Sequence, residues 1–173
     1  MVAKVYLDLA KKIDSIYKKK FPIGQKLMDT ISQEAERTGE VRTILGRRTL
    51  FDLWVPEHNA YGKKKPKPLP YSQAFKLYGV DLKRANCYKA VNYKLQGSAA
   101  DLMKKGMVGA YNEGIFERTG YPHITVHDEL DFSYHPDLKK DFDDLRECME
   151  NAIQLKVPVV MDMETGPDWG HVK

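Results

Sequence analysis

Apolar positions repeat at helical spacing through the first 38 residues, with lysines on the opposite side. The apolar stripe is formed by Val5, Leu7, Leu9, Ile13, Ile16, Ile23, Leu27, Met28 and Ile31. The pattern is interrupted at Phe21-Pro22, because proline removes a backbone donor and breaks a helix interior. We therefore predict helix over 2–38, broken at that proline and stopped by Gly39.

The spacing changes to alternation after Gly39. The stretch VRTILGRRTLFDLWV (41–55) is rich in β-branched and aromatic residues, so we predict strands around Gly46. Prolines and lysines dominate the next stretch, and we predict a flexible insertion loop over 56–78. For its KKKPKP portion, a solubilising surface loop is favoured over a specific DNA-binding arm.

Helical spacing returns between Asp81 and Arg118. Three glycines, Gly97, Gly106 and Gly109, interrupt its apolar side. Each should cost roughly 1 kcal/mol relative to alanine inside a helix. Two explanations are open: a break near Gly97, or a neighbouring backbone that approaches closely.

The chain then returns to alternation in PHITVHDELDFSY (122–134). We predict a β-hairpin with His127-Asp128-Glu129 at or near its tip. A helix should follow from Pro136 to about Leu155, with Asp137 as N-cap, and then a last strand in VPVVMDME (157–164). This order of elements predicts a single partial domain over 1–173 of the α+β class, with helices packed on a small antiparallel sheet.

Bulk composition narrows the class of protein only slightly. The 173 residues carry a net charge of +4, and no apolar run approaches the roughly 20 residues of a membrane helix. Cys87 and Cys148 stand far apart without a second cysteine nearby, which is typical of reduced thiols in a cytoplasmic protein. We expect no membrane partner.

Charge is distributed unevenly between the two halves of the chain. Residues 1–100 hold 20 Lys and Arg against 9 Asp and Glu, whereas residues 101–173 hold 8 against 15. A basic half fits a polyanionic partner and an acidic half fits cation binding, but two solvated faces explain the asymmetry equally well.

Candidate chemistry lies in two places. Asp128 and Glu129 are adjacent carboxylates, whose joint ionisation is favoured by a bound cation, and their oxygens suit Mg²⁺. Taken alone, a simple polar turn is the favoured interpretation. Asn92 and Gln96 lie four residues apart, on one helix face, and their amides can pair with base edges; taken alone, they are typical of a solvated helix.

Four segments in order resemble one known family. TILGRRTLF, QGSAADLMKKGM, VHDEL about 31 residues further on, and VPVVMDMETGPDW are similar to the C-terminal palm region of family A DNA polymerases, the bacterial DNA polymerase I type. The resemblance extends from about Thr43 to Trp169 and identifies the hairpin with the family's motif C. It implies a palm-like fold and DNA-directed, template-dependent nucleotidyl transfer in DNA replication.

The resemblance also implies roles for particular residues. Asp128 would bind the catalytic Mg²⁺ pair, with Glu129 beside it in a supporting catalytic role, and His127 would lie near the primer terminus. Asn92 and Gln96 would contact the DNA primer-template, and the second substrate would be a dNTP. In this two-metal mechanism, one ion activates the primer 3′-hydroxyl and the other holds the triphosphate.

The sequence departs from the family pattern in important ways. Tyr88 stands where the family commonly has an arginine, and two upstream elements are absent: the strand with the other catalytic Asp, and the nucleotide-binding helix. We therefore expect a split or fragmentary, phage-like polymerase whose second chain supplies these motifs, inactive as an isolated chain. The alternative is a non-catalytic DNA-binding accessory module derived from a polymerase; an unrelated α+β protein would have to match all four segments by accident.

Overall fold

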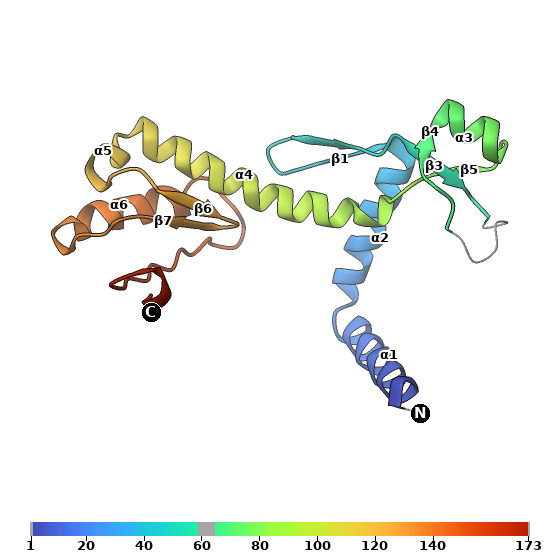
Figure 1. Cartoon of the computed structure of the whole chain (residues 1–173), viewed down its shortest axis with the longest axis horizontal. Coiled ribbons are helices and arrows are strands. Elements are labelled where there is room, and N and C mark those ends of the chain that lie inside the picture. Colours follow the sequence, from blue (N-terminus) through green and yellow to red (C-terminus); the bar gives the residue numbers. More distant parts are fainter. Residues whose placement is uncertain (1, 59–64, 173) are drawn as a thin grey trace. The chain divides into compact units, whose positions relative to one another are not determined.

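The protein is represented by a computed structural model that describes residues 2–58 and 65–172 (Figure 1). It divides into two compact units, Met1–Leu95 and Gln96–Lys173, whose boundary falls inside the long helix α4 (Ala90–Asn112). Each unit has its own hydrophobic core. Within the described ranges, every helix is too short or too polar to span a lipid bilayer.

The first unit begins with two helices, α1 (Val2–Lys20) and α2 (Pro22–Thr38). Phe21 separates them, and Pro22 occupies the first turn of α2. The N–H groups of a first turn have no partner within the helix, so the missing N–H of proline costs no hydrogen bond there. Gly39 closes α2 with a left-handed φ of 77°, and its N–H donates to the Ala35 carbonyl. The predicted break and stop are both confirmed.

A hairpin follows, made of β1 (Glu40–Arg42) and β2 (Arg48–Leu50), which pair antiparallel. Gly46, with φ 84°, lies in the connecting turn, so the predicted strands around this glycine are confirmed. The core of the first unit joins the hairpin to α2 and to the start of α4. It consists of Ile31, Ala35, Val41, Phe51, Cys87, Ala90 and Val91.

A three-stranded antiparallel sheet of order β4-β3-β5 completes this unit. Its elements are β3 (Leu53–Pro56), β4 (Leu69–Pro70), helix α3 (Tyr71–Tyr78) and β5 (Leu82–Arg84), followed by a 3₁₀ turn, η1 (Cys87–Lys89). The predicted loop over 56–78 differs from the structure at residues 69–78. Residues 69–70 form β4, and apolar side chains at helical spacing over 71–78 form α3. Residues 59–64 of that loop lie outside the described residues. Residues 82–84, predicted as helix, form a strand because pairing with β3 overrides local periodicity.

Three helices build the second unit: the second half of α4, α5 (Ile115–Thr119) and α6 (Lys139–Glu150). Helix α4 continues through all its glycines, so there is no break near Gly97. Close approach of a neighbouring backbone, the other explanation, is confirmed at Gly106, where an added Cβ would lie 3.3 Å from the Met149 Cα atom of α6 and 2.5 Å from its Sδ atom. Gly106 therefore lets α4 pack directly against Met149 of α6.

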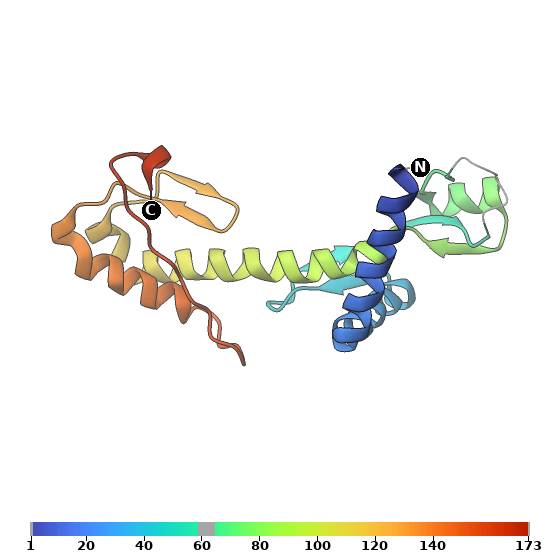
Figure 2. The ribbon, with the colours of Figure 1, turned by 90° about the horizontal axis from the view of Figure 1, so that it is seen from below.

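The hairpin of the second unit is formed by β6 (Ile124–Val126) and β7 (Glu129–Asp131). Figure 2 shows it beside the helices of this unit, with no ribbon of the unit covering its tip. The predicted hairpin is confirmed. With the helices, these small antiparallel sheets also confirm the predicted α+β class.

Two predictions near the C-terminus are wrong. The turn η2 (Pro136–Leu138) precedes α6, and its N-cap is His135, whose ring accepts the Asp137 N–H; Asp137 itself lies inside the turn. Residues 157–164 form no strand, and no described strand pairs with them. A strand needs a neighbouring edge for its backbone hydrogen bonds, and Val157 and Val160 consequently stay largely exposed. A final 3₁₀ turn, η3 (Trp169–His171), ends the described chain.

Candidate functional site

The tip of the β6–β7 hairpin is a two-residue turn. Val126 and Glu129 are cross-strand partners, so His127 and Asp128 alone connect the strands. His127 has a φ of 53°, in the left-handed region that residues other than glycine seldom occupy. Such backbone strain costs about 1–3 kcal/mol and tends to persist at functional sites. The turn therefore places Asp128 at the end of the hairpin.

The hairpin is anchored by the side of β7 that faces the helices. Leu130, Phe132 and Tyr134 alternate along the chain and pack against the core of the second unit. The Phe132 and Tyr134 rings lie 5.4 Å and 5.2 Å from the Phe142 ring of α6, centroid to centroid. Because alternate side chains of a strand face opposite ways, this packing leaves Glu129 exposed on the other face.

The carboxylates at the tip lie in water. Asp128 and Glu129 are both exposed, as is His127, so all three predicted site residues stand in water at the tip of the hairpin. Across residues 2–58 and 65–172, no three His, Cys, Asp or Glu side chains lie close enough to hold a metal ion together. The tip thus offers two neighbouring carboxylates. A protein Mg²⁺ site usually combines one or two carboxylates with waters and substrate phosphates, so this tip can supply the protein ligands of one ion only.

A third carboxylate belongs to the same hairpin. Asp131 lies two residues beyond Glu129 and pairs across the hairpin with Ile124. Its Oδ2 atom is buried and has no hydrogen-bond partner in the described part of the chain. A buried acceptor without a partner is costly, and sequence analysis did not single out this residue.

The other two predicted site residues lie on α4. Asn92 and Gln96 are both exposed and stand one turn apart on the same helix. Tyr88, in the preceding 3₁₀ turn, is 72% exposed, and the Lys89 ammonium lies 5.8 Å from its ring centroid. The start of α4 and the 3₁₀ turn before it therefore present amide, aromatic and cationic groups to solvent.

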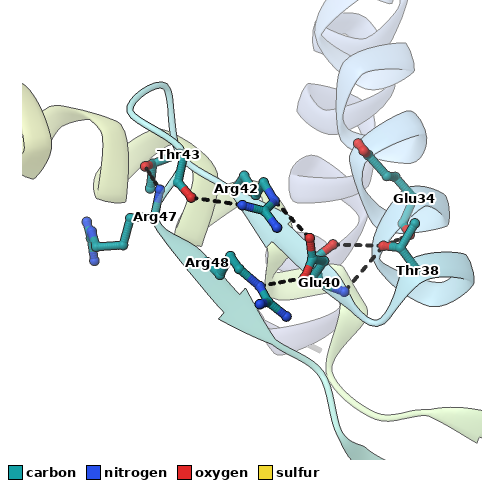
Figure 3. Close-up of polar contacts among 8 residues, drawn as sticks. Glu34, Thr38, Glu40, Arg42, Thr43, Arg47 and Arg48 are labelled. Carbon is teal, nitrogen blue, oxygen red and sulfur yellow. Dashed lines mark hydrogen bonds and ion pairs between the residues drawn. The ribbon is translucent and has the colours of Figure 1, made fainter.

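The β1–β2 hairpin concentrates arginine side chains (Figure 3). Arg42 and Arg48 are directly opposite one another, an arrangement that like charges normally destabilise. The Glu40 carboxylate lies between them and accepts hydrogen bonds from Arg42 Nε at 2.8 Å and Arg48 Nε at 2.7 Å. The hydrogen bond from Arg42, together with the charges of both arginines, lowers the pKa of Glu40.

The turn of this hairpin carries a third arginine. Thr43 Oγ1 accepts the backbone N–H of Arg47 at 3.1 Å, and the Gly46 N–H donates to the Thr43 carbonyl, which fixes the turn (Figure 3). Sequence analysis found the GRR segment but missed Glu40 and Arg42. The sequence could have indicated them, because Glu40 and Arg42 are two residues apart in a strand and therefore lie on the same face.

Comparison with known proteins decides the family. The sequence profile of DNA polymerase family A matches residues 3–171. This chain belongs to DNA polymerase family A. The chain is 29% identical to DNA polymerase I of Pseudomonas aeruginosa over 96% of its length, and 31% identical to that of Synechocystis over 84%. It is also 28% identical, over 88% of its length, to a DNA-directed DNA polymerase of Pseudomonas phage M6.

The structural comparison gives the same family. The polymerase domain of Pol1 from M. smegmatis, solved with DNA primer-template and dNTP, superimposes on 87% of this family A chain with a TM-score of 0.61 and 26% identity. The chain covers 23% of that structure and about 15% of the bacterial relatives. The chain is thus a family A segment that spans a small part of those polymerases.

Proposed function

We propose that this chain supplies the motif C hairpin of a template-directed DNA polymerase. The observation that carries the proposal is the two-residue turn of β6–β7, which exposes Asp128 and Glu129 at the tip of a hairpin anchored on α6. Membership in family A, whose members use divalent metal ions, supports nucleotidyl transfer as the chemistry.

Asp128 is the residue that would hold Mg²⁺ in this proposal. Its carboxylate is exposed and adjacent to Glu129, and oxygen ligands of this kind are those that Mg²⁺ prefers. The two residues fit part of a metal site. Bound Mg²⁺ would supply activation of the primer hydroxyl and neutralisation of the triphosphate charge.

The remaining metal ligands come, in this proposal, from a second polymerase chain. Two neighbouring carboxylates cannot surround two metal ions, and the described residues place no third His, Cys, Asp or Glu ligand beside them. The segment 157–164 is largely apolar and pairs with no strand in the described part of the chain, which is consistent with a sheet that other polymerase segments complete. The isolated chain is expected to incorporate no nucleotide.

The primer-template and dNTP are the substrates of the complete enzyme. His127 would lie near the primer terminus. The side-chain amides of Asn92 and Gln96 would donate hydrogen bonds to base edges of the bound duplex and accept hydrogen bonds from them. The positive charge of residues 1–100 supports contact with DNA phosphates.

The proposal is tested by primer extension with the chain and its polymerase partner combined. Asp128→Asn should abolish extension and leave DNA binding unchanged, because it removes one metal-ligand charge and little volume. Asp131→Asn is the matched control, with the same charge change on the same hairpin, and it should retain most extension. Equal extension by Asp128→Asn and wild type would instead support a non-catalytic, DNA-binding accessory role.

A further inference from the structure

Helix α3 and the sheet next to it expose aromatic rings that the proposed catalysis does not use. We define the α3 aromatic row as Trp54, Tyr71 and Phe75. Tyr71 is 55% and Phe75 46% exposed, while Trp54 is half-buried. The Tyr71 ring centroid lies 5.2 Å from that of Trp54 and 6.1 Å from that of Phe75. The rings are therefore contiguous and reach solvent at one end.

Trp54 and the end of α3 are each tied to neighbouring backbone atoms. The Arg84 guanidinium lies 4.6 Å from the Trp54 ring centroid, and it also donates to the Phe51 carbonyl at 2.8 Å and the Glu36 carbonyl at 3.2 Å. At the other end of α3, the Tyr78 hydroxyl donates to the Lys67 carbonyl at 3.0 Å. The Trp54 ring, fixed in this way, loses little freedom when a partner binds.

The surroundings of the row are basic. Residues 65–84 contain five Lys and Arg against one acidic residue. Lys76 is exposed between Phe75 and the exposed Leu77, and Lys67 is exposed just before β4. Protein–protein interfaces are depleted in lysine, whereas proteins that bind single strands combine lysine and arginine with aromatic platforms. The basic charge and the exposed rings together therefore favour, as the partner of this surface, a negatively charged polymer with flat groups that can stack, rather than an apolar polypeptide.

We propose that the α3 aromatic row is a binding surface for single-stranded nucleic acid. Unpaired bases stack on Tyr71 and Phe75, and the phosphates between them lie near Lys67 and Lys76. A duplex fits this surface less well, because its base faces are already covered by stacking within the helix. The surface requires neither a metal ion nor Asp128, so it is independent of the proposed catalytic role.

The test measures the anisotropy of a labelled oligo-dT and of a labelled duplex of equal length with the full chain. Phe75→Ala should weaken oligo-dT binding by about fivefold or more, the effect of one lost stacking contact. Phe75→Leu, which keeps apolar bulk, should weaken it as well, and Phe75→Trp should retain it. Leu77→Ala is the matched control on the same helix: it removes exposed apolar surface without a ring, and should leave binding unchanged.

Salt dependence provides the second readout. Lys76→Gln should reduce the slope of log affinity against log salt by about 0.7, as expected for one lost phosphate contact on a single strand. Circular dichroism checks that each variant is folded. Three results would each overturn the proposal: no oligo-dT binding by the wild type, equal affinity for Phe75→Leu and wild type, or equal weakening of duplex and oligo-dT binding. Equal affinity for Phe75→Leu and wild type would indicate that another polypeptide covers the row, because apolar bulk would then suffice in place of a ring.

Discussion

Replacing His127 should separate backbone strain from chemistry at the hairpin tip. The perturbation compares His127→Gly with His127→Ala, because both remove the imidazole and only glycine accepts a φ of 53° without a steric penalty. A left-handed conformation costs a residue with a Cβ roughly 1–2 kcal/mol. Glycine in turn loses about 0.5–1 kcal/mol more backbone entropy on folding. The glycine variant should therefore be the more stable of the two by about 0.5–1 kcal/mol.

The assay is urea unfolding of the full chain, followed by circular dichroism. The slope of the unfolding free energy against urea concentration must be the same in all variants, so that the comparison reports stability alone. Thr125, inside β6, is the matched control position on the same hairpin. There the order should reverse, with Thr125→Ala more stable than Thr125→Gly, since the strand needs no left-handed residue. If position 127 also favoured alanine, the inference that the turn stores backbone strain at His127 would be wrong.

Three further outcomes follow from contacts elsewhere in the chain. Gly106→Ala should lower the free energy of unfolding by about 1 kcal/mol in urea titrations, because overpacking against the buried Met149 outweighs the helix propensity gained. Glu40→Gln should make thermal stability less dependent on pH. The wild-type carboxylate has a lowered pKa, so its contribution is present above the ordinary pKa of Glu and is lost as pH falls through the lowered value; equal melting-temperature losses from pH 7 to pH 3 in both proteins would contradict this. Arg118→Ala should lower the midpoint of urea unfolding only slightly, because its ion pairs with Asp141 and Asp144 join α5 to α6 but are partly exposed. A large drop in the midpoint would contradict this.

The elements that could be predicted from sequence are those with a local signal. Pro22 and Gly39 mark helix ends through their own backbone preferences, and the alternation on both sides of His127-Asp128 marks a hairpin. The site residues at that tip could be named for the same reason, because a two-residue turn brings sequence neighbours together.

The elements that were mispredicted depend on distant partners. Residues 82–84 form a strand only because β3 lies beside them, and residues 157–164 form none because no described strand does. Helix α3 had a local helical pattern, but the prolines and lysines before it concealed that pattern. Its exposed rings, with Tyr71 beside Trp54, depend on the sheet and could not be inferred from spacing alone.

The central claim is that Asp128 is the metal-binding residue of a partial polymerase site. The most direct test follows the amide signals of the isotope-labelled chain by NMR as Mn²⁺, a paramagnetic substitute for Mg²⁺, is added. We predict selective broadening centred on His127, Asp128 and Glu129, lost in Asp128→Asn and retained in Asp131→Asn. Broadening centred elsewhere, or unchanged by Asp128→Asn, would contradict the account.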